Sequence, residues 1–285
     1  MALPPQIFDR ALIAKRLARR APDDDFVSKL VLADLAERLL AVTRKFERAL
    51  LMAPDARVLP EVGASAAGPI VFERAATAVG ATGMPLLDPE NLVLPRTGYD
   101  LIVSILDLTA VNDVPGFLAR VRAHLAPDGL LLAALLGGDT LSELRQSFLA
   151  ADAELSGGAF ARVAPFLQLG DAGPLLQRTG FALPVTDIES HLIRYASPLA
   201  LIRELKALGA GNPLRDRPAR LMTPRLLAAA SQAYERIAGD ADGRVRATLE
   251  IVWLSGWAPH ESQQKPLAPG SAEVSLAKVL GRKRG

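Results

Sequence analysis

Polar side chains follow each of several short apolar runs in the first half of the chain, and their types suit the binding of a nucleoside. In chain order these residues are Pro54 and Asp55, Glu73, Asp88, Asp107 and Thr109, and Gly137 to Thr140. If the runs are parallel strands, their carboxyl ends meet at the edge of the sheet where open α/β folds bind ligands. We expect Glu73 to bind ribose hydroxyls and Asp88 to accept a hydrogen bond from an adenine amino group.

The sequence does not contain the motifs that several other common kinds of site require. The sequence has no G-x-S-x-G, no P-loop and no G-x-G-x-x-G, and the nearest fragment, GAGNPL, is not preceded by a strand pattern. HESQQ lacks the second histidine of a zincin helix, and the three histidines are widely spaced without a metal-binding pairing. We therefore expect no metal site. With no cysteine, the chain excludes disulfides, thiolate zinc sites, iron–sulfur clusters and a cysteine nucleophile.

Charge and composition indicate which kinds of partner and which cellular compartment to expect. Lys and Arg number 33 against 31 Asp and Glu, so the net charge of +2 is too small to indicate nucleic-acid binding. The longest uninterrupted apolar stretch, Leu130 to Leu136, is far shorter than the roughly 20 residues of a membrane span. No signal-peptide core follows the N-terminus. We expect a soluble protein, and the lack of cysteine fits the reducing cytoplasm.

The arrangement of apolar runs predicts the elements that position these residues. RALLM, GPIVFE, MPLLD, DLIVSIL and GLLLAALL are continuous apolar runs separated by loops or helix-length segments, as in strands buried on both faces. Residues 113–125 read as a helix, a further strand is expected after Gly180, and 247–257 read as a strand that joins the sheet late. The pattern predicts an α/β fold with a doubly wound, mostly parallel sheet.

Helices are expected before this sheet and as an insertion within it. Residues 1–48 are expected to form an N-terminal helical segment, with helices at about 7–20 and 26–46, and residues 49–285 the α/β domain. Residues 198–242 are expected to be a helical insertion before the last strand, broken by prolines. Helix 7–20 has an apolar face and many basic residues, so it either docks on its own core or contacts an anionic membrane or a partner.

GGDTLSELR, residues 137–145, has a structural and a functional interpretation. Thr140 and Glu143 have the spacing of a capping box, which predicts a helix over 140–155 after the turn at Gly137 and Gly138. Alternatively, Asp139, Thr140 and Arg145 line the mouth of a pocket or bind a partner protein, because this helix begins at the ligand edge of the sheet.

PHESQQKP near the end of the chain has two interpretations as well. It is either a turn-rich segment that closes over the last strand, or a surface on which His260, Glu261 and Lys265 bind a peptide. Trp253 and Trp257, in the strand before it, are expected to be core residues.

Several of these segments together resemble one known family. IFDR, the stretch from DLIVSILDLTAVND to GGDTLSELR, VAPF, DAGPLLQRTGFALP and GWAPHESQQKPLAPGSA are similar to the methyltransferase-like assembly factors of respiratory complex I and their bacterial relatives. The resemblance covers nearly the whole chain. It implies a seven-stranded class I methyltransferase (Rossmann-like) fold, S-adenosylmethionine (SAM) as cofactor, and a complex I subunit as protein partner. The mitochondrial form is associated with arginine hydroxylation, and the carrier-protein methyltransferases of biotin synthesis are more distant relatives.

The chain departs from this family at the end of the first strand. The family pattern A-L-D-L-G-C-G-x-G places Leu51 at the aspartate, and Ala53, Asp55 and Arg57 at the three glycines. Glycine allows close approach of the backbone to a ligand, so the three replacements add bulk where SAM would lie. Leu51 also removes a carboxylate that would hold the methionine amino group.

A second departure concerns the same pocket. The family's His-Trp pair is replaced by Thr109 and Ala110, whereas Glu73 and Asp88 still match its ribose and adenine positions. Two hypotheses follow. The chain is either a binding protein, a possible pseudoenzyme with weak or lost SAM binding, or an enzyme with a remodelled pocket for methyl transfer or arginine modification. For the enzyme, the candidate bases are Asp107, Asp139 and His260.

Overall fold

One mixed sheet organises the molecule. The computed structural model describes residues 5–218 and 222–264. Within them, seven strands form a sheet in the order β2-β3-β1-β4-β5-β7-β6. The strands are β1 (Ala49–Asp55), β2 (Val62–Ser65), β3 (Gly68–Val79), β4 (Tyr99–Ile105), β5 (Leu125–Leu136), β6 (Ala182–Tyr195) and β7 (Val245–Trp257).

The sheet is mostly parallel, as predicted. β3, β1, β4 and β5 pair in parallel, while β7 runs antiparallel to both β5 and β6. The seventh strand is a different segment from the one expected. MPLLD makes only an isolated parallel bridge, Ala76 to Leu86, and the outer edge is completed by β2, which forms an antiparallel hairpin with β3.

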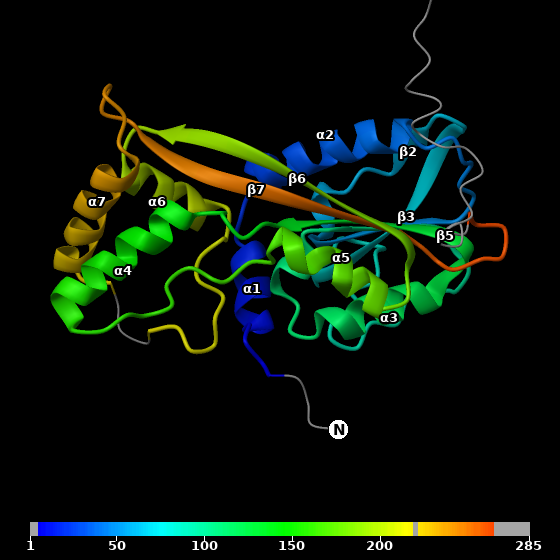
Figure 1. Ribbon diagram of the computed structural model, residues 1–285, viewed down its shortest axis with the longest axis horizontal. Coiled ribbons are helices and arrows are strands. Elements are labelled where there is room, and N and C mark those ends of the chain that lie inside the picture. Colours follow the sequence, from blue (N-terminus) through cyan, green and yellow to red (C-terminus); the bar gives the residue numbers. More distant parts are fainter. Residues whose placement is uncertain (1–4, 219–221, 265–285) are drawn as a thin grey trace, which may run out of the picture.

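The two faces of the sheet are covered by different helices (Figure 1). α2 (Phe26–Leu40) packs Val31, Leu35 and Leu39 on one face, and it ends earlier than the predicted residue 46. α3 (Val114–His124), close to its predicted range, and α5 (Leu169–Arg178) cover the other face. Helices on both faces confirm the doubly wound architecture of the class I methyltransferase fold.

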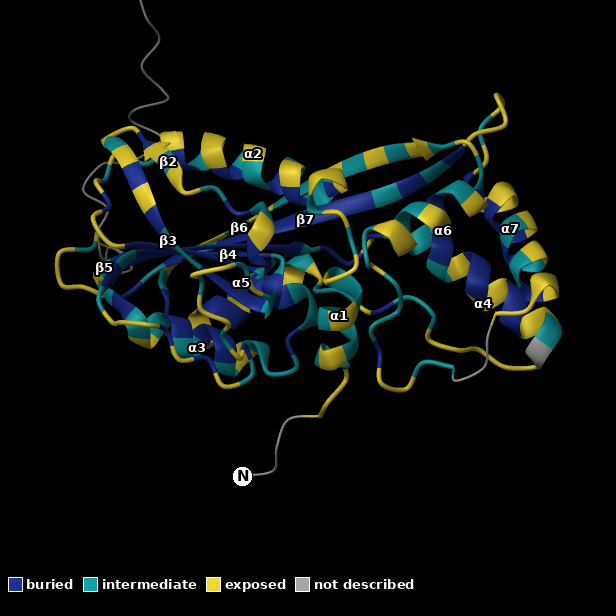
Figure 2. Ribbon diagram, turned by 180° about the vertical axis from the view of Figure 1, so that it is seen from behind, coloured by how far each residue is buried: buried dark blue, intermediate teal, exposed yellow. Residues whose placement is uncertain are grey.

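The helical insertion forms a second apolar cluster at the far ends of β6 and β7 (Figure 1). The predicted insertion, residues 198–242, contributes α6 (Pro198–Ala207) and α7 (Pro224–Ala238) to this cluster, and α4 (Ser142–Ser156), which lies between β5 and β6, completes it. Figure 2 shows β7 buried along most of its length, whereas side chains of β6 alternate between partly buried and exposed, as on an edge strand. The two long strands thus connect the insertion to the main sheet.

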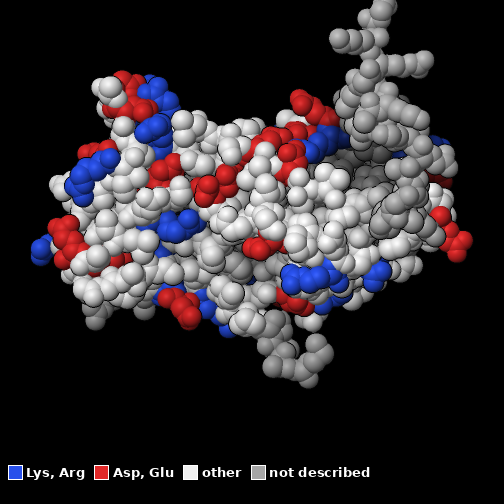
Figure 3. Space-filling model, viewed as in Figure 1, with Lys and Arg blue, Asp and Glu red and all other residues white. Residues whose placement is uncertain are grey.

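The surface of this insertion carries paired charges. At its tip, Arg194 contacts Asp240 (2.9 Å) and Asp242 (2.7 Å). Figure 3 shows Lys and Arg groups interspersed with Asp and Glu groups on one face of the molecule.

Two features of the N-terminal half determine what lies at the ligand edge. The connection from β1 to β3, residues 56–67, contains the short 3-10 helix η2 (Ala56–Val58) and β2 but no α-helix, although parallel strands are usually joined through one. α1 (Arg10–Leu17), shorter than the predicted 7–20, packs against β1 and β3. The N-terminal segment therefore docks on its own core, as one of the two interpretations proposed. The division into domains at residue 48 stays a prediction.

Candidate functional site

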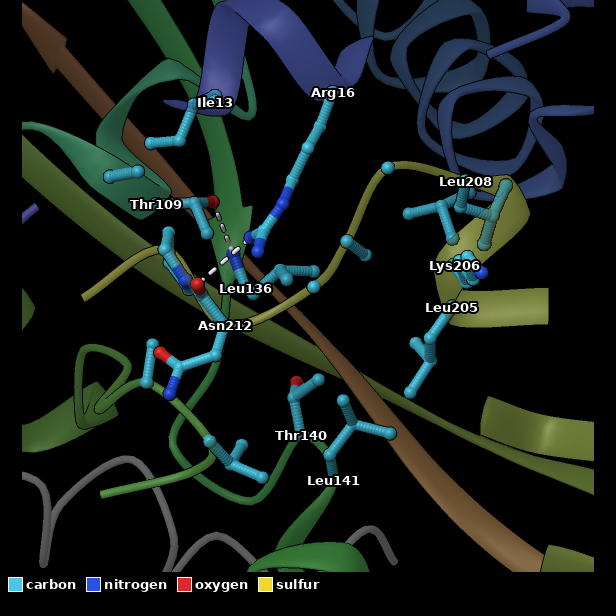
Figure 4. Close-up of a pocket in the computed structure, with 18 of the residues that line it drawn as sticks. Ile13, Arg16, Thr109, Leu136, Thr140, Leu141, Leu205, Lys206, Leu208 and Asn212 are labelled. Carbon is cyan, nitrogen blue, oxygen red and sulfur yellow. Dashed lines mark hydrogen bonds between the residues drawn. The ribbon is translucent and has the colours of Figure 1, made fainter. Parts of the chain in front are cut away.

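A cavity of about 960 Å³ lies at the carboxyl edge of the sheet, between the strand ends and the helical insertion (Figure 4). We call it the edge cavity. Its walls come from the ends of β1, β4 and β5, from α1, from α4 and α6, and from the loop after α6. Most of the lining side chains are apolar. Its size and lining are those of a small-molecule site.

The end of β1, where the family has glycines, holds a group of four charged side chains, the ionic cluster: Arg20, Asp25, Asp55 and Arg57, of which Arg57 is exposed. Asp55 Oδ2 accepts from Arg20 Nη2 at 2.9 Å and from Arg57 Nη2 at 2.8 Å. Arg20 also donates to Asp25. Asp55 is only 1% exposed, so its carboxylate is out of contact with bulk water.

The arginines determine the charge of Asp55. Burial by itself would raise the pKa of this carboxyl, but hydrogen bonds from Arg57 and Arg20 outweigh it and hold the pKa below its usual value. Asp55 is therefore a fixed anion whose oxygens are already engaged, and it cannot serve as a ligand without breaking the cluster.

These residues do not fit SAM in the position that the resemblance implies. The backbone after β1 turns into η2, whose cap is the Asp55 side chain accepting from Arg57 N, so no helix N-terminus faces the cavity there. Leu51 is fully buried in the cluster under α2 and does not line the cavity. Ala53 does line it. Two of the three family glycine positions, Asp55 and Arg57, are thus occupied by the protein's own charged contacts.

Arg10 of α1 covers a second part of the edge, at the end of β3. Its guanidinium donates to Thr77 O (3.1 Å) and to Ala110 O (3.2 Å). Behind it, Asp107 is fully buried and accepts from Thr77 Oγ1 and from Ser104 Oγ (2.9 Å). Burial raises the pKa of Asp107 to about 6, although both hydroxyls and Arg10 oppose the rise. Asp107 does not line the cavity, so Arg10 and not this carboxyl faces it.

The two residues expected to bind the nucleoside lie apart from the cavity. Glu73 is inside β3, six residues before its end at Val79, because this strand is longer than the run GPIVFE. Glu73 accepts from Tyr99 Oη (2.9 Å) and pairs with Arg96 (3.1 Å). Asp88 accepts from Glu90 N and Asn91 Nδ2 in a local turn. Their roles toward ribose and adenine stay predictions, and their positions do not favour them.

The GGDT turn is held by β7 and not by the capping box. α4 begins at Ser142 after Leu141, a residue with positive φ (55°) and no side-chain cap. Thr140 Oγ1 instead donates to Glu250 O (3.2 Å) and accepts from Glu250 N (3.0 Å). Glu143 accepts from Thr248. The helix was predicted correctly, but its cap was wrong, because both polar side chains bind the neighbouring strand.

The other residues of this turn have similar structural contacts. Asp139 is exposed, and its N–H donates to Glu250 Oε2 (2.8 Å). Arg145 donates to three backbone oxygens: Gly138 O, Thr140 O and Ala164 O. Only Thr140 of the three candidates lines the edge cavity. A partner-binding role for Asp139 and Arg145 stays a prediction.

We expect Thr140→Ala to lower the free energy of unfolding by about 1–3 kcal/mol, because it leaves the buried Glu250 N–H without an acceptor. Thr140→Ser retains the hydroxyl and should cost much less. Urea unfolding of both variants measures the difference. Equal losses would show that the methyl group, and not the hydroxyl, matters at this position.

PHESQQKP follows the far end of β7. β7 runs antiparallel to β5 and pairs Trp257 with Leu130 and Ile251 with Leu136, the cavity end of β5, so the segment after Trp257 leads away from the cavity. His260 and Glu261 are exposed, and His260 contacts Ser262. Lys265 lies outside the described residues. The structure therefore does not bring these residues together with Asp107 or Asp139, and peptide binding by them stays a prediction.

The tryptophans of β7 pack in the core, as expected. Trp253 is 2% exposed and belongs to the cluster under α2, with Arg38 over its ring at 4.8 Å. Trp257 is partly buried at the edge of the same cluster.

Sequence reasoning missed the residues that shape the site most: Arg10, Arg16, Arg20 and Glu250. The three arginines had been assigned to the basic face of the N-terminal helix, away from its apolar face. The number of arginines in a segment that also has an apolar face suited to packing on the core could have indicated their burial. Long basic side chains often bury their aliphatic stems and bind buried acids. Nothing in the sequence pairs Arg20 with Asp55.

Residues 5–218 and 222–264 contain neither a candidate metal site nor a candidate membrane span. In that part of the chain, no three His, Cys, Asp or Glu side chains are grouped so that they could hold a metal ion. None of its helices is long and apolar enough to cross a membrane.

Similarity to known proteins is clear at the level of whole sequences. No protein-family model matches the chain. The Rattus norvegicus protein named "Arginine-hydroxylase NDUFAF5, mitochondrial" is 34% identical over 284 residues, which cover 95% of this chain and 82% of the relative. Its Danio rerio counterpart is 38% identical over 192 residues, 67% of this chain and only 60% of the relative.

Other similar proteins are named or described as methyltransferases. The malonyl-[acyl-carrier protein] O-methyltransferase of Halorhodospira halophila is 34% identical over 197 residues, 69% of this chain and 65% of that protein. Among solved structures, a Bacillus halodurans protein described as a methyltransferase aligns with a TM-score of 0.46 and 12% identity, over 80% of this chain and 99% of that one.

Proposed function

Because the chain belongs to the family of the mitochondrial protein named arginine-hydroxylase NDUFAF5, we propose that it is a methyltransferase-fold assembly factor that acts on a protein partner, a subunit of respiratory complex I, with weak or lost binding of SAM. The observation that carries the second part is the ionic cluster, which fills the end of β1 with the protein's own charges.

Electrostatics supports weak SAM binding. A nucleoside seated at the end of β1 would have to displace Arg20 from Asp55, and the buried carboxylate would then lose a charge-assisted hydrogen bond. One such bond contributes about 1.5–3 kcal/mol, or a factor of roughly 10 to 100 in affinity. The acids expected to bind ribose and adenine do not line the cavity, so they offer no compensation.

Calorimetric titration with SAM and its demethylated product tests this part. We expect no saturable binding of either compound at 1 mM, and saturable binding below about 100 µM would contradict the proposal. A double variant, Arg20→Met with Asp55→Gly, removes both charges of the central pair and frees the end of β1. Binding that appears only in this variant would identify the cluster as the obstruction. Leu51→Asp should be left out of such designs, because it would place a carboxylate in the core under α2.

The proposed partner is tested in the source organism. A strain that lacks the gene should lose fully assembled complex I on native gels, and the wild-type gene should restore it. Full restoration by the Arg20→Met, Asp55→Gly variant as well would show that the cluster is dispensable for this role. Normal assembly in the deletion strain would contradict the proposal.

The second candidate is an enzyme with a remodelled pocket, for methyl transfer or arginine modification, supported by the names of the relatives. The charge of the edge cavity argues against a substrate arginine inside it. Seven Arg and Lys side chains line the cavity, namely Arg10, Arg16, Arg19, Arg20, Arg162, Lys206 and Arg217, against the two acids Asp25 and Asp55. A substrate guanidinium would enter a surplus of positive charge.

A cytoplasmic location also stays a prediction, since the relatives named NDUFAF5 are named mitochondrial. Fractionation of cells of the source organism, with an antibody to the chain, would test it.

A further inference from the structure

The edge cavity has two chemically different ends. The inner end, between the insertion and the start of β7, is apolar. It is lined by Leu141, Leu144, Phe148, Leu201, Leu205 and Leu249. Figure 4 shows Leu141 and Leu205 on one side of the cavity and Arg16 reaching in from α1 on the other.

The outer end is basic, and Arg16 is its central residue. Arg16 Nη1 donates to Asn212 O at 2.8 Å. Within the described ranges, no carboxylate lies within ion-pair distance of its guanidinium. Arg19 and Lys206 also line the cavity and have no ion pair within the described ranges, whereas Arg217 is paired with Asp9 (3.1 Å).

The loop after α6 is shaped around Arg16. This loop contains GAGNPL, the fragment that resembles a glycine-rich nucleotide loop without the strand before it. A Cβ on Gly211 would lie 3.1 Å from Arg16 Cζ, and one on Gly209, whose φ is +73°, would lie 3.2 Å from the Arg16 backbone. The two glycines thus let the loop approach α1 closely and hold the guanidinium at the cavity.

Holding a cation here without a counter-charge is unfavourable. Burial lowers the pKa of Arg16, and the neighbouring charge of Arg217 lowers it further, while Asp9 opposes both effects. An anion bound at this end would relieve the repulsion between the two guanidiniums, and a hydrocarbon chain would fill the apolar end.

We propose that the edge cavity is a binding site for an amphiphile with one hydrocarbon chain and one anionic head group, with the chain among the leucines of α4 and α6 and the head on Arg16. A carboxylate and a phosphate are both suited to the guanidinium, and the source is either a free fatty acid or a phosphorylated single-chain lipid. The proposal does not rest on the ionic cluster, because its anchoring residues are other residues of the same cavity.

Equilibrium dialysis of the full chain, freed of lipid, against labelled palmitate tests the proposal. We expect saturable binding of one palmitate per chain, with hexadecanol bound at least tenfold more weakly, because it lacks the charge. Monohexadecyl phosphate is the second arm. Tighter binding than palmitate identifies a phosphate head, and weaker binding a carboxylate head, both within the proposal.

Three variants give the position of the ligand. Arg16→Met should weaken palmitate at least tenfold and leave hexadecanol unchanged, and Leu205→Trp, which narrows the apolar end, should weaken both. Arg203→Met is the matched control, since Arg203 is exposed on α6 and does not line the cavity. No saturable palmitate binding at 1 mM, or equal affinity of wild type and a folded Arg16→Met for palmitate, would overturn the proposal. If Arg16→Met does not fold, Leu205→Trp decides alone, and unchanged palmitate affinity in it overturns the assignment.

Discussion

Replacing Asp55 with alanine is expected to lower the free energy of unfolding by about 3–5 kcal/mol, the usual effect of removing one partner of a buried ion pair. Arg20, whose side chain is 8% exposed, would keep its charge and retain only Asp25 as partner. Arg57 would also lose the carboxylate to which it donates twice from its side chain. Urea unfolding at neutral pH, followed by circular dichroism, gives the difference.

A control variant separates two effects of Asp55→Ala: the cost of leaving the buried charge of Arg20 without this partner, and the loss of the attraction between the two charges. Arg20→Met with Asp55→Leu removes both charges and leaves Asp25 bonded to Ser28, so this double variant should be more stable than Asp55→Ala. Asp187→Ala breaks an exposed pair with Arg38 and should cost less than about 1 kcal/mol. If Asp55→Ala lowers the free energy of unfolding no more than Asp187→Ala does, the ionic cluster contributes no more to stability than an exposed ion pair.

Asp107→Asn is expected to change how stability depends on pH. The folded-state pKa of Asp107, about 6, is above the ordinary value of 3.8, so the folded protein binds more protons than the unfolded chain between about pH 4 and pH 6. The contribution of this group to the free energy of unfolding therefore falls as pH rises through that window. A pKa raised this far corresponds to about 3 kcal/mol.

The asparagine variant lacks this contribution. Its stability relative to wild type should rise by about 2–3 kcal/mol between pH 4 and pH 7.5, measured by urea unfolding at several pH values. Parallel stability curves for the two proteins would contradict the assignment of a raised pKa to Asp107. The effect arises from the burial of Asp107 and requires no catalytic role for this carboxyl. Arg10, and not Asp107, faces the cavity.

The sheet could be predicted because its information is local. Strands buried on both faces need uninterrupted apolar residues, and DLIVSIL and GLLLAALL, which lie within or across β4 and β5, have them. Run boundaries were less informative. The apolar run GPIVFE stops at Glu73, yet β3 continues to Val79. A polar side chain such as Glu73 ends the apolar run but does not end the backbone hydrogen bonding of β3 to β1. This single error moved the expected ribose site away from the ligand edge.

The contacts that define the site could not be predicted, because they join distant residues. Arg20 and Asp55 are 35 positions apart, and Thr140 and Glu250 are 110 apart. The spacing of Thr140 and Glu143 did indicate a capping box, but both side chains gain more from β7, whose backbone groups need partners. Likewise, the missing glycines predicted an altered loop, while only the structure reveals that Asp55, at one of their positions, is bonded to Arg20 of the segment after α1.

The walls of the edge cavity come from both ends of the described chain, since the segment around α1 forms a bridge from Phe8 to Leu214, and the start of β7 completes the apolar end. Contacts of such long sequence separation form late in folding, after the sheet that supports them. On the ribosome, α1 can pack on β1 and β3 once these strands have formed, whereas the bridge from Phe8 to Leu214 cannot form until Leu214 has emerged. A ligand in this cavity would therefore bind only chains that have finished folding, and its occupancy would report on their maturity.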